Sequence, residues 1–303
     1  MIKIENLHKS YKGHKVLKGL DIEVNRGEIY GFIGHNGVGK STTMNILAGL
    51  INFQEGKCII NGRDSSCKGL KNKDIGYLPE DPKFYPYMSA WEYLDFIGRI
   101  GGEAGNIIKE KAAKLLERVK LEKAAKRPIG GYSRGMKQRL GLAVAMYHDP
   151  FVYLLDEPSS ALDPEGRLDM VNIIEELKSQ GKTVFLSTHI LNDIERVCDR
   201  VGIIHDGKIV VEDKLDSLIG KYIQPVYDIE FMKKPEKDIS DRLIKLDYVE
   251  KVDTQDNKVS ITIKNVERDS KNLLREVIES NACITSINLR RNSLEEIFMK
   301  VAK

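Results

Sequence analysis

The chain has 303 residues, a length that accommodates about two domains at roughly 100–200 residues each. Hydrophobic residues make up 41% and charged residues 31%, a balance that indicates a folded globular protein and argues against intrinsic disorder. The formal net charge is only +3, so the composition gives no polybasic signature for nucleic acid or for an anionic membrane.

No apolar run reaches the roughly 18 residues that a membrane-spanning helix needs, and the first residues lack the apolar core of a signal peptide. We therefore expect any membrane role to come through a partner. The four cysteines lie far apart, without the spacing of a disulfide framework or a zinc site, which fits a reducing cytoplasm. They are Cys58, Cys67, Cys198 and Cys283.

Residues 1–222 have the pattern of one α/β domain. Short apolar, β-rich segments that each lead into a helical segment predict buried parallel strands. They are Glu28–Ile33, Phe151–Leu155 and Thr183–Ser187. Asp206-Gly207 predicts a hairpin turn between Val201–Ile204 and Lys208–Val211.

Between residues 83 and 147 the strand pattern is absent, and the spacing of apolar residues predicts a helical insertion. Its helices are expected over Ala90–Ile100, Asn106–Val119 and Arg134–Tyr147. The Lys-rich stretch Ile107–Arg127 is interpreted as a solvated helix face rather than as a membrane-surface patch.

Residues 225–303 have the order β-α-β-β-α-β, which predicts a small α+β domain of the ferredoxin-like type. The strands are expected over Val226–Phe231, Asp247–Thr254, Val259–Lys264 and Cys283–Arg290. A short helix is expected after Phe231, and further helices at Arg268–Ser280 and Leu294–Val301. From Pro225 onward 15 basic residues balance 15 acidic ones, so this domain has no net charge to attract nucleic acid.

The segment Gly34-His-Asn-Gly-Val-Gly-Lys-Ser41 matches the phosphate-binding pattern G-x-x-x-x-G-K-[ST] between a predicted strand and a predicted helix. Its glycines allow backbone N–H groups to surround a phosphate, and the helix N-terminus adds positive potential. Lys40 is expected to contact the β- and γ-phosphates and Ser41 to bind Mg²⁺.

Asp156 and Glu157 end an apolar strand, where buried carboxylates are costly unless they hold a metal or do chemistry. We expect Asp156 to support Mg²⁺ and Glu157 to orient and polarise the attacking water. The alternative is that the two residues are a surface acidic pair at a strand end. The presence of a phosphate-binding loop in the same chain makes this interpretation the weaker one.

Ser133 precedes a predicted helix whose first turn contains Gly135 and no acidic residue. Ser133 can be an ordinary helix N-cap, but such a helix start can also receive an anion. The chain then offers two phosphate-binding surfaces for one nucleotide, which suggests two copies that enclose ATP between them.

These motifs make the chain resemble the ATPase subunits of ATP-binding cassette (ABC) transporters over nearly all of residues 1–215. Gly34–Ser41 resembles the Walker A motif, Tyr132–Met136 the signature, Leu154–Pro158 Walker B, Ser160–Asp163 the D-loop and Ser187–His189 the switch histidine. The resemblance implies a P-loop cassette with antiparallel β pieces and a helical subdomain. It also implies ATP and Mg²⁺ as cofactors.

The resemblance assigns residues to roles. Nucleotide binding falls to Tyr11, which is placed like the aromatic that stacks on adenine, and to Gly34, His35, Asn36, Gly37, Val38, Gly39, Lys40, Ser41 and Thr42. Catalysis falls to Glu157, His189 and Lys40, and the metal to Ser41, Glu80 and Asp156. Ser133, Arg134 and Gly135 serve the partner chain's ATP, and Asp163 belongs to the D-loop.

Two positions depart from the family pattern. Arg134 stands where many signatures carry glycine, and Glu80 stands at the usual Q-loop glutamine. The C-terminal segment Leu294-Glu-Glu-Ile-Phe298 resembles that of single-cassette bacterial and archaeal exporters, whose membrane subunits are separate chains. This domain carries none of the nucleotide motifs, so its removal near Lys221 is expected to leave MgATP affinity largely intact while altering dimer stability or regulation. The alternative is that the domain only covers apolar surface on the cassette, in which case its removal would cause aggregation.

The expected function is an ATPase subunit that dimerises on MgATP, as a homodimer or a paired cassette dimer, and drives a separate membrane permease, in export. Its location would be the cytoplasmic face of the membrane, with no nucleic acid partner. The alternative is a soluble ABC ATPase acting on nucleic acid or ribosomes, but 116 residues between Lys40 and Asp156 leave no room for a long coiled coil. A catalytically dead cassette conflicts with the intact Lys40, Asp156, Glu157 and His189.

Overall fold

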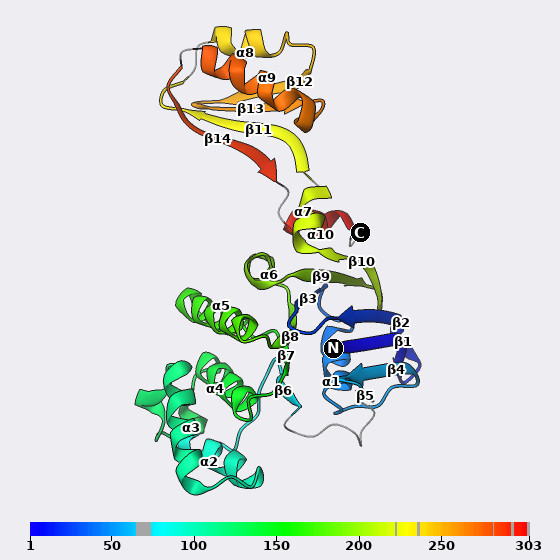
Figure 1. The fold of residues 1–303 in the computed structure, drawn as a ribbon, viewed down its shortest axis with the longest axis vertical. Coiled ribbons are helices and arrows are strands. Elements are labelled where there is room, and N and C mark those ends of the chain that lie inside the picture. Colours follow the sequence, from blue (N-terminus) through cyan, green and yellow to red (C-terminus); the bar gives the residue numbers. More distant parts are fainter. Residues whose placement is uncertain (65–73, 222, 235–236, 281, 292–293, 302–303) are drawn as a thin grey trace. The chain divides into compact units, whose positions relative to one another are not determined.

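The computed structural model describes residues 1–303 except 65–73, 222, 235–236, 281, 292–293 and 302–303 (Figure 1). By their contacts the residues form two compact units, 1–215 together with 298–303, and 216–297. The predicted domain boundary at 222–225 lies near this division and stays a prediction. The division differs from it in grouping the end of the last helix with the first unit.

A six-stranded sheet forms the centre of the first unit, in the order β10-β9-β3-β8-β7-β6. Its strands are β3 (Ile29–Ile33), β6 (Ile75–Leu78), β7 (Val152–Asp156), β8 (Thr183–Thr188), β9 (Arg200–His205) and β10 (Lys208–Lys214). All neighbours are parallel except β9 and β10, which form the predicted hairpin. Every residue of β3, β7 and β8 is buried, as the continuous apolar runs predict. The parallel register brings the ends of these three strands to one edge of the sheet.

A second, antiparallel sheet has the order β2-β1-β4-β5. It consists of β1 (Ile2–Tyr11), β2 (His14–Val24), β4 (Glu55–Ile60) and β5 (Arg63–Asp64). Helix α1 (Lys40–Leu47) contacts both β4 of this sheet and β7 of the central one. Its buried residues Met44, Ile46 and Leu47 join the apolar core that the two sheets share. The N-terminus of α1 is thereby fixed at the edge where β3 and β7 end.

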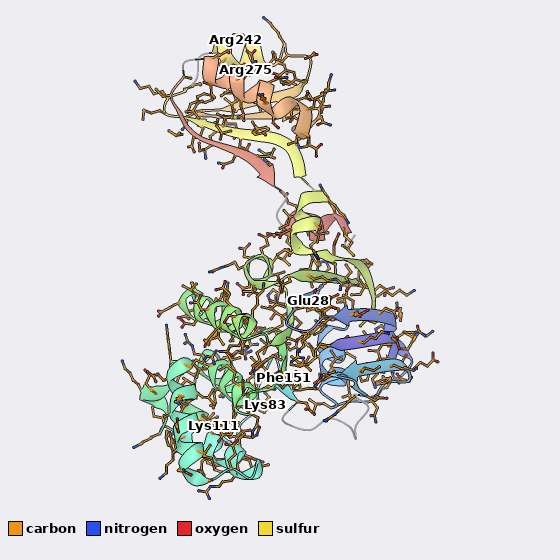
Figure 2. The ribbon with its side chains drawn as sticks, viewed as in Figure 1. Glu28, Lys83, Lys111, Phe151, Arg242 and Arg275 are labelled. Atoms are coloured by element: carbon orange, nitrogen blue, oxygen red, sulfur yellow. The ribbon has the colours of Figure 1, made fainter. Side chains whose placement is uncertain are left out.

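The predicted helical insertion is a group of helices, α2 (Ala90–Ile100), α3 (Gly105–Arg118) and α4 (Arg134–Met146), with short 3₁₀ turns at Glu122–Ala124 and Ile129–Gly131 (Figure 1). A capping box between Ser89 and Glu92 begins α2. Lys111 of α3, labelled in Figure 2, pairs with Glu103 at 2.7 Å. Helices α5 (Pro164–Ser179) and α6 (Leu191–Val197) pack against β8 and β3, respectively.

The second unit is an antiparallel sheet, in the order β12-β13-β11-β14, covered on one face by α8 and α9 (Figure 1). The elements of this part of the chain are α7 (Leu215–Lys221), β11 (Ile223–Phe231), α8 (Lys237–Leu243), β12 (Val249–Gln255), β13 (Lys258–Ile263), α9 (Val266–Glu279), β14 (Ile284–Arg291) and α10 (Leu294–Val301). This topology is the predicted ferredoxin-like one. Alternate residues of β11, among them Ile229 and Phe231, supply its core.

Among the described residues no cysteine forms a disulfide. Cys58 and Cys198 are buried, and Cys283 is exposed. Cys67 lies outside the described residues. Within the described part of the chain, every helix is too short or too polar to cross a membrane.

Candidate nucleotide-binding site

The loop Gly34–Ser41 connects β3 to α1 at the carboxyl edge of the central sheet. Two of its glycines have positive φ, +85° at Gly37 and +114° at Gly39, which favours a residue without a side chain. A Cβ added at Gly39 would also lie 2.6 Å from Leu17 Cδ2. The glycines are therefore required by backbone conformation and by packing, and they leave the first N–H groups of α1 directed out of the helix.

Lys40 is buried, with 6% of its surface exposed, and its ammonium is held inside the loop. Its Nζ donates to Gly34 O at 2.7 Å and to His35 O at 3.3 Å, and lies 3.5 Å from Glu157 Oε1. A buried cation is costly unless it is paired and hydrogen-bonded. These contacts place the charge beside the loop that would receive a phosphate.

Glu157, the residue after β7, has a strained backbone with φ of +48°. Such a conformation costs a non-glycine residue about 1–2 kcal/mol and persists only where its surroundings hold it. Here the N–H of Glu157 donates to Ser187 O at 2.9 Å, and Gln138 Nε2 donates to Glu157 O at 3.4 Å. The neighbouring strand β8 and helix α4 thus fix the direction of the Glu157 side chain.

His189, directly after β8, joins the same carboxylate. Its Nδ1 donates to Glu157 Oε2 at 2.8 Å and its backbone N–H reaches the same oxygen at 3.3 Å. The Glu157 side chain is 6% exposed, whereas that of His189 is 56% exposed. Lys40, Glu157 and His189 therefore form one contiguous row of polar side chains from the buried loop to the surface.

Asp156 ends β7 and is 1% exposed. Burial raises the pKa of its carboxyl above 3.8, the Ser187 and Ser41 hydroxyls that donate to it oppose that rise, and the charges of Glu157 and Glu80 add to it. A carboxylate that is costly to ionise gains most from a bound cation. Asp156 and the Ser41 hydroxyl are the hard oxygen donors that Mg²⁺ prefers, so these residues fit the ion.

Of the described residues, no group of three or more His, Cys, Asp or Glu converges as a metal site. Mg²⁺ typically takes only one or two carboxylates from a protein and completes its shell with substrate phosphates and water.

A cavity of about 360 Å³ lies at the loop and the strand ends. Its walls are Asn36, Gly37, Gly39, Lys40, Ser41, Thr42, Glu80, Glu157 and His189. Residues from four separate stretches of sequence therefore meet here, all of them predicted site residues. Asp156 lies behind this wall, and the charge of Glu80 acts on it.

Other predicted residues lie outside the cavity wall. Gly34, His35 and Val38 are on the far side of the loop, and a Cβ at Gly34 would lie 2.6 Å from Ile204 Cγ2. Tyr11, at the end of β1, is 45% exposed, with Lys9 Nζ 4.7 Å from its ring centroid. Stacking of Tyr11 on adenine stays a prediction.

The signature residues form a separate surface at the start of α4. Ser133 is the N-cap, and its Oγ accepts from Met136 N at 3.2 Å. A Cβ at Gly135 would lie 3.1 Å from Ala161 O, so this glycine packs closely against the D-loop segment. Asp163, predicted in the D-loop, is the N-cap of α5 and accepts from Gly166 N at 2.9 Å. Ser133, Arg134, Gly135 and Asp163 do not line the cavity of their own chain.

The two departures from the family pattern lie next to each other. Arg134 Nη2 is 4.0 Å from Glu80 Oε1, and both side chains are more than half exposed. An exposed pair at this distance contributes little to stability, about 0–1 kcal/mol. Its significance is positional, because it connects the start of α4 to a residue of the cavity wall.

Sequence reasoning left two supporting residues unassigned. Ser187 lies in the quoted switch segment, but its hydrogen bond to Asp156 depends on the pairing of β7 with β8. Gln138 is fully buried on α4 and contacts Glu157 across 19 residues of sequence. No sequence pattern indicates either contact, because both depend on strand pairing and helix packing.

Two family profiles match the sequence. The ABC transporter profile covers residues 17–160, and the profile of the ATP-binding protein DrrA1-3-like C-terminal domain covers residues 214–302. The uncharacterized ABC transporter ATP-binding protein YxlF of Bacillus subtilis is 37% identical and covers 99% of both chains. The bacitracin transport ATP-binding protein BcrA of Bacillus licheniformis is 42% identical over 72% of this chain and 71% of its own.

Solved cassettes share the architecture of the first unit. The ATP-binding subunit of an ABC transporter superimposes with a TM-score of 0.66 at 30% identity, over 73% of this chain and 93% of its own. A dimeric cassette in a post-hydrolysis state, bound to ADP and Pi, has a TM-score of 0.66 at 27% identity, over 71% and 99% of the two chains.

Proposed function

Because the chain belongs to the ATP-binding, ATP-hydrolysing subunits of ABC transporters, we propose that two cassettes enclose MgATP between the P-loop cavity of one copy and the signature surface of the other. One observation carries this proposal. The cavity gathers Lys40, Glu157 and His189 in one chain, while Ser133–Gly135 lie outside its wall. A helix N-terminus without acidic residues is thus left facing outward, as a second phosphate surface requires.

Each residue of the row has a distinct part in hydrolysis. Lys40 and the N–H groups at the start of α1 bind the phosphates, and Ser41 and Asp156, with Glu80 nearby, would hold Mg²⁺. The ion, when bound, neutralises phosphate charge. Glu157 accepts a hydrogen bond from the attacking water and orients it, and His189 fixes the rotamer of Glu157 through the 2.8 Å contact.

The dimer is tested with two substitutions at Ser133. Aspartate and threonine can both cap α4, but aspartate places a negative charge at the proposed phosphate surface. In a background that cannot hydrolyse ATP, Ser133→Thr is expected to dimerise with MgATP and Ser133→Asp to remain monomeric in light scattering. Equal dimerisation of both variants would contradict the proposal.

A membrane subunit is the proposed partner, supported by relatives that are named transport proteins. The surface of the helical group contains a cavity of about 530 Å³. It is lined by Tyr87, Met88, Trp91, Glu92, Asp95, Phe96 and Arg99. Tyr85, Tyr87 and Phe96 are exposed there, although apolar side chains of this size are usually buried. The residues of this surface follow the loop of Glu80 in the sequence. A protein bound here would therefore contact the segment that comes directly after the cavity wall. We propose that a cytoplasmic segment of the permease binds it, which holds the chain at the cytoplasmic face of the membrane, with export as the direction that the resemblance implies.

The test is recovery of a polytopic membrane protein from detergent-solubilised membranes with affinity-tagged chain. Tyr87→Ser is expected to reduce the recovery strongly, whereas Ile107→Ser, an exposed apolar residue on α3, leaves it unchanged. Recovery of nucleic acid or ribosomal proteins in place of a membrane protein would support the alternative function.

A further inference from the structure

The last helix of the chain ends beside the nucleotide-binding loop. Leu294, Ile297 and Phe298 of α10 are buried at the i, i+3, i+4 spacing of one helix face, while Met299 is 54% exposed. By contacts, residues up to Ile297 group with the second unit and residues from Phe298 onward with the first. The side chain of Phe298 thus belongs structurally to the ATPase unit although it follows the C-terminal domain in sequence.

Phe298 contacts His35 of the loop. The ring centroids are 4.7 Å apart with planes inclined at 56°, and Phe298 is only 8% exposed. Aromatic pairs prefer tilted geometries at separations of about 4.5–7 Å and gain stability beyond simple burial. The exposed imidazole of a loop residue is thereby held from outside the loop.

The His35 backbone connects this contact to the phosphate site. His35 O, with Gly34 O, accepts a hydrogen bond from Lys40 Nζ. On the far side of the loop, Gly34 packs against Ile204 without room for a Cβ, whereas a Cβ at Gly37 would meet no atom within 4 Å. The first two residues of the loop are therefore held by contacts outside the cavity, whereas Asn36, Gly37 and Gly39 line it.

We propose that Phe298 is a positioning residue for nucleotide binding: its ring holds His35, and His35 holds the loop segment that orients Lys40. The inference rests on the proposed function of the cavity as the nucleotide site. A loop fixed before binding loses less conformational entropy when it receives phosphates, so the aromatic pair raises nucleotide affinity. Phe298 acts on the phosphate-binding loop, whereas Glu157 and His189 act on the attacking water. The rate at which bound nucleotide is hydrolysed therefore does not depend on Phe298.

The test measures MgATP affinity and steady-state hydrolysis in the full chain. Phe298→Leu keeps an apolar side chain but removes the ring, and His35→Ala removes the other ring. Each is expected to weaken MgATP binding and raise KM by about three- to tenfold, the size of an aromatic pair energy, with kcat within about twofold of wild type. The double variant is expected to be no weaker than either single variant, because both remove the same contact.

Two controls separate positioning from stability. His35→Phe keeps an aromatic ring at this exposed position and is expected to bind MgATP more tightly than His35→Ala. Met299→Ala, on the exposed side of the same helix, is expected to leave affinity and thermal midpoint unchanged. If Phe298→Leu folds poorly, His35→Ala tests the pair from the loop side, where no core is disturbed.

The outcomes are distinguishable. Unchanged affinity in His35→Ala, or strictly additive losses in the double variant, would overturn the inference. Lys40→Ala that binds MgATP normally would instead overturn the proposed nucleotide site itself. The inference also reverses an expectation from sequence, because removal of the chain beyond Lys221 takes Phe298 with it and should weaken MgATP binding.

Discussion

The helices α1 and α4 of the cassette have similar N-termini, but the residues around the two N-termini differ. Both α1 and α4 begin without an acidic residue in the first turn, so both N-termini attract anions. At α1, Lys40 of the helix lines a cavity together with Glu157 and His189 from the sheet edge. At α4 the first residue, Arg134, instead forms an exposed pair with Glu80. The difference indicates that one side can bind a nucleotide alone, while the other is completed only by a second molecule.

The largest expected effect tests the catalytic row on the P-loop side. Glu157→Gln keeps the size of the side chain and the hydrogen bond from His189, but loses the basic carboxylate. We expect MgATP binding to persist while turnover falls by about 10²- to 10⁴-fold, the usual contribution of a general base. Phosphate release and nucleotide affinity are the measurements, and turnover at the wild-type rate would exclude Glu157 as the base.

A mixing experiment tests the comparison directly. Lys40→Ala disables the P-loop of its own chain, and Ser133→Arg disables the signature surface that serves the partner. Each variant alone is expected to be inactive. An equal mixture should recover about a quarter of wild-type hydrolysis, because half of the dimers are mixed and each has one intact site. No recovery at any ratio would argue against composite sites.

The pair between the two sides gives a smaller effect. Glu80→Gln removes one charge from the cavity wall and the partner of Arg134, and we expect hydrolysis to continue with a severalfold higher Mg²⁺ requirement. Stimulation by the permease should also change. Arg134→Gly is the matched control, since it breaks the same pair without changing the cavity wall. Superimposable Mg²⁺ titrations of Glu80→Gln and wild type would remove Glu80 from the metal site.

The smallest effect concerns stability without nucleotide. Because the pKa of Asp156 is raised in the folded chain, mainly by burial, the native state binds more protons than the unfolded state just above pH 3.8. Stability is therefore lost as pH rises through that window. Asp156→Asn should be more stable than wild type at pH 7 by ~1 kcal/mol, although inactive, and the gain should vanish near pH 4. Thermal or urea unfolding without Mg²⁺ provides the measurement.

Much of this protein could be predicted from sequence because its signals are local. The apolar runs of β3, β7 and β8 are buried over their whole length, so their strands are continuous in the sequence. The loop Gly34–Ser41 can be recognised from its glycine pattern, because φ and packing allow only glycine at position 39. The helical insertion and the β-α-β-β-α-β order of the second unit also follow from periodicity alone.

Tertiary structure decided which distant residues support the site. The strained backbone of Glu157 is held by Ser187 and Gln138, which depend on strand pairing and helix packing and have no spacing rule in sequence. The contact between Phe298 and His35 joins residues more than 260 positions apart. Residue type and periodicity determine what each segment can form, but only the folded chain brings side chains of separate segments within contact distance, where their charges and rings act on one another.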